Sequence, residues 1–137
     1  MLAKEAGTWD AEIRMYLQGP QAPPSEYKGV EKVEMVSGGL FSRSTVTAAF
    51  GDRRFEGHGL FGWDPHQEKY TGVWVDSFNA APTSMTGTYD AEKEALTFES
   101  VVRDEAGNEF KQKQVTTFVD ENTRRFEAFL IVEQGGQ

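Results

Sequence analysis

The stretch from Arg53 to Phe78, RRFEGHGLFGWDPHQEKYTGVWVDSF, contains the pattern that decides the fold class. Apolar residues and glycines alternate with polar residues on both sides of Asp64-Pro65-His66. Alternation of period two is typical of a β-strand with one buried face, and aspartate followed by proline favours a tight turn. Strands joined by so short a turn must be antiparallel neighbours, because a parallel crossover needs about a dozen residues or more. The stretch therefore predicts a β-hairpin.

The same alternation continues over almost the whole chain after Gly7, and helical periodicity is nearly absent. The connections between alternating segments are rich in glycine, aspartate and asparagine, which favour tight turns. The pattern predicts nine strands, at residues 8–17, 26–36, 40–50, 53–63, 68–78, 83–89, 95–103, 109–119 and 124–133.

Nine strands in one open meander would leave two long edges with unpaired backbone groups. Closing the sheet removes both edges. We therefore predict a single all-β domain over residues 1–137, an antiparallel up-and-down meander closed into a lipocalin-like β-barrel. A two-sheet sandwich is the main alternative, but it usually needs longer crossing connections, and only 18–25 and 79–82 are available. The first of these, QGPQAPPS, is either a lid over a barrel mouth or a stiff surface connector.

The composition narrows the classes of partner. The chain of 137 residues has a formal net charge of −8. Such a surface repels nucleic acid and anionic membranes, so neither is an expected partner. No apolar run approaches the ~20 residues of a membrane-spanning helix, and the first residues lack the apolar segment of a secretory signal. We expect a cytoplasmic protein. The sequence contains no cysteine, which excludes disulfides and thiolate metal sites.

The face that alternation assigns to the barrel interior is mixed in character. Large aromatic residues share it with glycine, serine, glutamine and carboxylate side chains. A solid core would not use these residues, because a buried polar group without a partner costs about 1–3 kcal/mol. Aromatic and polar positions together are typical of a cavity that holds water or a small molecule. In the ninth strand, the interior face is either that of Phe126 or that of Phe129. The predicted ligand-binding residues are Trp74, Asp76, Tyr70, Phe61, Phe98, Met85, Glu31, Gln112 and Gln114.

Asp76 is the strongest single candidate for a chemical role. It follows Trp74 on the predicted interior face, between aromatic residues. Loss of water around a carboxylate raises its pKa, so Asp76 would act there as an acid, a base or an anchor for a ligand. The alternative is a structural role, in which Asp76 caps a strand end and bonds to backbone or to Arg43. We give the structural role more weight, because ion pairs perturb carboxylates without any catalytic function.

Metal and cofactor chemistry is not expected. His66 lies in the predicted turn, and His58 alternates with glycines and points away from the interior, so the two do not converge as metal ligands would. A haem site of the nitrobindin-like kind would need a later histidine. The spacing Gly57-x-Gly59-x-x-Gly62 matches a dinucleotide fingerprint, but it lies within a strand and not at a strand–turn–helix junction. These glycines instead make room for a bulge or for a neighbouring aromatic ring.

The triplet Gly7-Thr8-Trp9 opens the first strand and resembles the lipocalin-type Gly-x-Trp signature. The resemblance implies a structural role for Gly7 and Trp9. The tryptophan would close one barrel end beneath an arginine from late in the chain, and either Arg124 or Arg125 suits that place. The sequence leaves the choice between them open.

A longer resemblance covers Gly7 to about Phe98, about two-thirds of the chain. This part is similar to an uncharacterised bacterial family, domain-of-unknown-function family 1579. The resemblance implies a lipocalin-like barrel and brings no established activity. It also implies a short helix before the Gly-x-Trp, which is nearly absent here. If the true start lies upstream, one barrel end is more open than in relatives. The segments that carry it are GTWDAEIRM, GPQAPP, SGG at 37–39, FEGHGLFGWD, YTGVWVD and GTYD.

Three functions are compatible with these observations. The first is a barrel that binds a small amphipathic or hydrophobic molecule in its lumen. The second is a non-catalytic interaction module that forms a homodimer through an apolar patch on the outer face. The third is an acid–base enzyme using Asp76 or Glu31, which we rank last because one carboxylate does not define a reaction. The residues expected in the outer patch are Val73, Val75, Phe129 and Ile131.

Overall fold

A computed structural model describes residues 2–16, 23–103 and 106–131. The structure does not describe Leu17 of the first predicted strand, Val132 of the ninth, or most of the predicted loop 18–25. The elements are η1 (Leu2–Glu5), β1 (Gly7–Tyr16), β2 (Ser25–Val36), η2 (Ser37–Gly39), β3 (Phe41–Phe50), β4 (Arg53–Asp64), β5 (Lys69–Asp76), β6 (Asn79–Asp90), β7 (Ala95–Arg103), β8 (Glu109–Phe118) and β9 (Thr123–Ile131).

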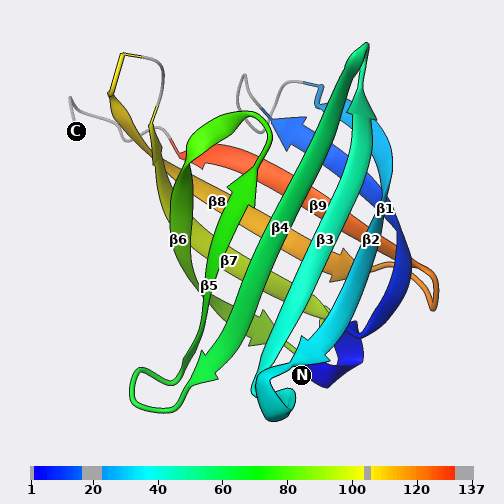
Figure 1. Ribbon diagram of the computed structural model, residues 1–137, viewed down its shortest axis with the longest axis vertical. Coiled ribbons are helices and arrows are strands. Elements are labelled where there is room, and N and C mark those ends of the chain that lie inside the picture. Colours follow the sequence, from blue (N-terminus) through cyan, green and yellow to red (C-terminus); the bar gives the residue numbers. More distant parts are fainter. Residues whose placement is uncertain (1, 17–22, 104–105, 132–137) are drawn as a thin grey trace.

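The strands form one closed barrel in the order β1 to β9, as Figure 1 shows. Each strand pairs with the next in antiparallel fashion, and β1 closes the barrel against β9. The prediction of a closed meander is confirmed, but that of an entirely antiparallel sheet needs one correction. In a meander with an odd number of strands the first and last run in the same direction, so β1 and β9 pair in parallel, with Ile13 opposite Phe126.

The connection between β5 and β6 is shorter than the sequence suggested. Residues 79–82 were expected to cross between elements, but they belong to β6, and the turn consists of Ser77 and Phe78. Pro82 is tolerated because the register shifts there: Asp76 pairs with Asn79, while Trp74 pairs with Thr83. Proline lacks an N–H and is found in strands at such irregularities.

The burial pattern follows the predicted interior face through most of the barrel. In β1, Trp9, Ala11 and Ile13 are buried. In β9, Ala128 is buried and Phe126 packs against the buried cluster around Ile13, which settles the interior face of that strand.

Three aromatic residues that alternate in phase with the predicted ligand-binding residues Phe61, Trp74 and Gln112 are partly exposed. Trp63 is 48% exposed and Phe110 is 40% exposed, because each lies near the end of its strand, beyond the enclosed part of the barrel. Trp63 meets Tyr70 edge to face, with ring centroids 4.8 Å apart. Phe78 is 38% exposed in the β5–β6 turn. Alternation predicts the face of a residue but not its height along the barrel axis.

Candidate binding cavity

The barrel encloses a cavity of about 320 Å³. Its lining has three levels along the axis: a charged base beside η1, an apolar middle, and a polar and aromatic rim where β5 turns into β6. The cavity reaches the surface at the rim, because Phe78 and Asn79 both line it and are exposed. The volume lies near the lower end of the range for ligand sites, about 300–1,000 Å³.

The structure brings most of the predicted ligand-binding residues together around this space. Tyr70 is the exception, because it does not line the cavity and packs behind it against the buried cluster of Met85, Leu96 and Phe98. The predicted residues that line the cavity are Glu31, Phe61, Trp74, Asp76, Met85, Phe98, Gln112 and Gln114.

Glycines in β4 and β5 give the large rings of the middle level their room. A Cβ atom on Gly57 would collide with the Trp74 ring, and one on Gly72 would collide with Phe61. A Cβ atom on Gly59 would come within 2.5 Å of Phe61 and 2.8 Å of Trp74. Of the two roles proposed for the β4 glycines, the structure shows room for neighbouring aromatic rings. The glycines therefore shape the apolar wall directly.

Arg124 lies at the base of the cavity between two carboxylates. Its Nη1 donates to Oε1 of Glu31 at 2.6 Å, and its Nη2 donates to Oε2 of Glu5 at 2.5 Å. Ser44 donates from Oγ to the other oxygen of Glu31 at 2.6 Å. The side chains of Arg124, Glu5 and Glu31 are 2%, 7% and 4% exposed. The three charged groups therefore form one buried network.

This network holds two negative groups against one positive group. Burial raises the pKa of the Glu5 carboxyl, an effect that the Arg124 guanidinium opposes. Burial also raises the pKa of Glu31, with the nearby Glu5 adding to the effect and Arg124 and Ser44 opposing it. Removing charged groups from water disfavours their ionised forms, and one guanidinium does not compensate two carboxylates.

Some polar atoms at the base have no hydrogen-bond partner among the described residues. They are Oε1 of Glu5, Oγ of Ser42 and Nε of Arg124. Ser42 is 1% exposed and lines the cavity together with Glu5. Buried polar atoms without a partner are costly, and in native proteins they often mark the place of a water molecule, an ion or a ligand.

The short helix η1 closes the lower end of the barrel and supplies Glu5. The Trp9 indole N–H donates to the backbone oxygen of Glu5 at 2.7 Å, which holds the helix against β1. The Arg124 Cζ lies 5.7 Å from the Trp9 ring centroid, whereas Arg125 pairs with Glu12 on the outer face. Almost no helix was expected before Gly7, whereas η1 forms at Leu2–Glu5, and Glu5 was not among the predicted site residues. No local pattern marks this residue, since only the fold places it beside Arg124.

Asp76 lies at the rim, at the end of β5. Its Oδ2 accepts the Trp74 indole N–H at 3.0 Å, and its Oδ1 accepts the backbone N–H of Phe78 at 2.8 Å. The backbone bond is the structural role considered for Asp76, while Arg43 pairs instead with Glu34. Asp76 thus orients the Trp74 ring and fastens the turn that follows.

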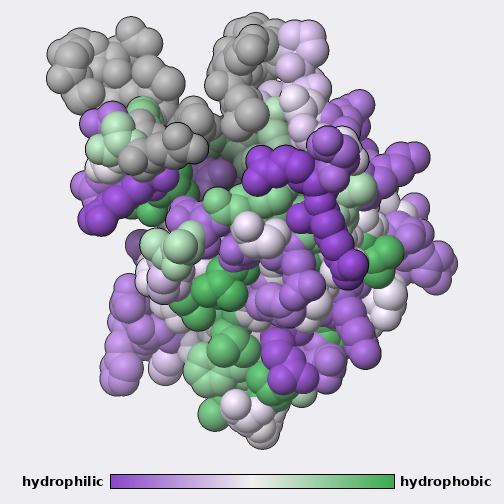
Figure 2. Space-filling view, turned by 45° about the horizontal axis from the view of Figure 1, so that its top comes forward, coloured by the Kyte–Doolittle hydropathy of each residue, from purple (hydrophilic) through white to green (hydrophobic). Residues whose placement is uncertain are grey.

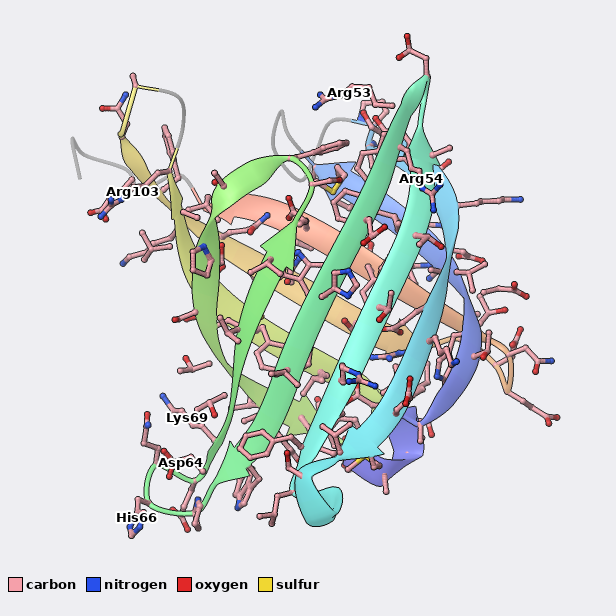
Figure 3. All side chains as sticks on the ribbon, in the orientation of Figure 1. Arg53, Arg54, Asp64, His66, Lys69 and Arg103 are labelled. Carbon is pink, nitrogen blue, oxygen red and sulfur yellow. The ribbon has the colours of Figure 1, made fainter. Side chains whose placement is uncertain are left out.

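The two histidines lie apart on the outside of the barrel. His58 contacts Glu56 at 2.9 Å on the outer face of β4. His66 projects from the β4–β5 turn, at the barrel end opposite Arg53 (Figure 3). Among the described residues, no three side chains of histidine, aspartate or glutamate gather as metal ligands would.

In the part of the chain that the structure describes, no helix is long and apolar enough to span a membrane.

The residues expected to form one outer apolar patch do not share a surface. Val73 and Val75 are exposed on β5, whereas Phe129 lies on β9 and stacks on Tyr16 with ring centroids 4.5 Å apart. The strands β6, β7 and β8 separate β5 from β9 on the shorter path around the barrel. Figure 2 shows apolar residues in patches interrupted by hydrophilic ones. The side chain of Ile131 lies outside the described part of the structure.

Comparison with known proteins gives one match. The family described as "Protein of unknown function (DUF1579)" matches residues 1–137. The chain belongs to this family. The DUF1579 match spans the whole chain, including the segment after Phe98 that the sequence resemblance did not use. No curated protein and no solved structure matches the chain. Membership in DUF1579 therefore assigns no activity, and any function must be argued from the cavity.

Proposed function

We propose that this DUF1579 barrel binds a small amphipathic molecule in its lumen. The observation that carries the proposal is the cavity of about 320 Å³, which combines an apolar wall with polar groups at both ends. Ligand sites are usually concave and mostly apolar, with a few polar groups that fix the orientation of the bound molecule. A barrel that served only as a scaffold would fill this space with side chains.

The wall of the cavity suits an apolar body. Phe61 and Phe98 meet with ring centroids 5.2 Å apart, and Trp74 packs against the buried clusters on both sides of the lumen. Trp74 is held by its hydrogen bond to Asp76, so this ring is oriented without a ligand. A preformed wall lowers the entropic cost of binding, because few side chains must be ordered.

A probe titration with a cavity-filling variant tests the proposal. Ala128 is buried and lines the cavity, so Ala128→Phe places a ring in the lumen. Val75→Phe adds a ring at an exposed position on the outer face and serves as the matched control. The probe is N-phenyl-1-naphthylamine, a neutral apolar fluorophore whose emission rises on leaving water.

We expect saturable binding to the wild-type protein, at least tenfold weaker binding to Ala128→Phe, and unchanged binding to Val75→Phe. Equal binding to all three proteins would place the probe outside the lumen and contradict the proposal, as would no binding to the wild type. Native mass spectrometry of freshly purified protein adds a search for a co-purifying molecule.

A further inference from the structure

The base of the cavity holds two carboxylates and one guanidinium, so it is short of positive charge. Glu5 from η1 and Glu31 from β2 face Arg124 from β9, so two carboxylates share one guanidinium. Both terminal nitrogens of Arg124 already donate to these carboxylates. The second oxygen of Glu31 accepts from Ser44. The second oxygen of Glu5 is buried and accepts from none of the described residues.

A second observation marks the same place as a site for a polar group. Ser42 is 1% exposed, lines the cavity, and has no partner for its hydroxyl among the described residues. A group that entered the base from the lumen would therefore meet a carboxylate oxygen and a free hydroxyl oxygen. The carboxylate oxygen only accepts hydrogen bonds, whereas the Ser42 hydroxyl both donates and accepts them. A carboxylate bonds most strongly to a charged donor.

From this arrangement we infer that the polar end of the ligand is a protonated amine, seated at the base against Glu5 and Ser42, with its apolar part along Phe61, Trp74 and Phe98. The inference rests on the proposed binding function and specifies the chemistry of the ligand. An ammonium group donates to the unpartnered oxygen of Glu5 and balances the second carboxylate. The aromatic wall fits the apolar part of such a molecule.

An anionic head group fits this base poorly. A fatty-acid carboxylate would bring a third negative charge beside Glu5 and Glu31, and the terminal nitrogens of Arg124 already bind one carboxylate each. Nε of Arg124 is the donor at the base that still lacks an acceptor among the described residues. A neutral oxygen, such as that of an ordered water molecule, satisfies it without adding charge. Like charges placed together without compensation weaken binding strongly.

The test compares three probes with the same eight-carbon chain: n-octylamine, 1-octanol and octanoate, titrated into the full-length protein at pH 7 by calorimetry. Their apolar parts are matched, so differences in affinity report the head group. We expect octylamine to bind at least tenfold more tightly than octanoate, with octanol between them, because hydrogen bonds to charged groups are the stronger ones. Octanoate binding as tightly as octylamine would overturn the inference.

Two variants distinguish the effect of the cavity base on amine binding from that of the negative charge of the whole surface. Glu5→Gln is expected to weaken octylamine binding about tenfold and to change octanol binding less than threefold. Glu12→Gln removes the same charge from the outer face, where Glu12 pairs with Arg125, and is expected to leave all three affinities unchanged. Equal effects of the two variants would show a general surface attraction and contradict the inference. If Glu5→Gln fails to fold, Ser42→Ala gives the same comparison at the base, and an unchanged preference for octylamine there contradicts the assigned seat.

The outcomes distinguish this inference from the function on which it rests. If octanol and the fluorescent probe bind in the lumen but octylamine is not preferred, the amine assignment fails and the binding function stands. If neither octanol nor the fluorescent probe binds the wild-type protein, both fail together.

Discussion

At the scale of single residues, Arg124 joins the two ends of the chain. It contacts Glu5 in η1 and Glu31 in β2, and its guanidinium lies 5.0 Å from the centre of the Phe118 ring. Removing one member of a buried ionic network leaves an uncompensated buried charge, which is strongly destabilising. The stability of the closed end therefore depends on this one side chain.

We expect Arg124→Met to lower the free energy of unfolding by about 3–5 kcal/mol, as measured by urea denaturation. Arg125→Met is the control, because Arg125 pairs with Glu12 at a partly exposed site and should cost less than about 1 kcal/mol. Adding Glu5→Gln and Glu31→Gln to Arg124→Met should restore much of the loss, since no buried charge then remains. Equal losses for the two arginine variants would show that the network is not buried in solution.

The same residues predict how stability depends on pH. The pKa values of Glu5 and Glu31 are raised by burial, so the folded protein holds these protons more tightly than the unfolded chain does. Stability from this source is fully present below the unfolded pKa of about 4.3 and is lost as pH rises through the higher folded values. Burial raises the pKa of the Tyr70 phenol, and the negative charge of Glu5 adds to this effect.

The measurement is the free energy of unfolding between about pH 4 and pH 8 for the wild type and for the Glu5→Gln, Glu31→Gln double variant. The exposed carboxylates Asp64 and Asp120 have lowered pKa values, so they make the fold more stable as pH rises. They do so equally in both proteins. The difference between the two curves therefore isolates the contribution of Glu5 and Glu31 to the pH dependence of stability. We expect the wild type to lose stability relative to the double variant as pH rises, and a constant difference would contradict the assignment.

At the scale of elements, β4 and β5 work as a unit in which glycines face large rings. A strand interior usually disfavours glycine, because it adds entropy to the unfolded chain and has no side chain to pack. In β4 that cost is offset because Gly57 and Gly59 leave space for Trp74 and Phe61. The alternation in FEGHGLF thus makes room for the Trp74 ring of β5 and for the Phe61 ring of β4 itself.

A double-mutant cycle between Gly57 and Trp74 tests this reading. The close contacts of a Cβ atom on Gly57 all come from the Trp74 ring. We expect Gly57→Ala to destabilise the wild type by about 1–3 kcal/mol through overpacking. In a Trp74→Ala background the same change should be neutral or stabilising by up to about 1 kcal/mol. A similar cost in both backgrounds, measured by chemical denaturation, would mean that the ring does not occupy that space.

At the scale of the whole molecule, the parallel pair of β1 and β9 removes both sheet edges. Every strand of the described residues has a neighbour on each side, and the backbone N–H of Asp10 donates to the oxygen of Asn122 at 2.7 Å where the pair begins. The closure also brings Arg124 next to Ala11, so the barrel and the buried charged base form together. An open sandwich would separate these elements and expose the lumen.

Hydrogen exchange measures the closure directly. In the closed barrel we expect the paired amides of β1 and β9 to be protected to the same degree as those of β3 and β4, because none lies at an edge. The N–H of Asp10 is a convenient reporter at the junction. Fast exchange along one of the two terminal strands, with β3 and β4 still protected, would show that the sheet is open.

The sequence by itself determined the strands, their order and the barrel interior, because these depend on local turn chemistry and on a period of two that each strand carries in its own residues. It also led to most of the cavity wall, including Trp74, Phe61 and Glu31. Glu31 and, as one of two alternatives, Arg124 were also named from the sequence, but the contact of Arg124 with Glu5 was not predicted. These two residues are 119 positions apart, and neither has a neighbouring pattern that points to the other. Only the parallel closure of β1 on β9, with η1 folded across the end, brings them into contact. Pairing at such a separation depends on the path of the whole chain, which no short stretch of sequence encodes.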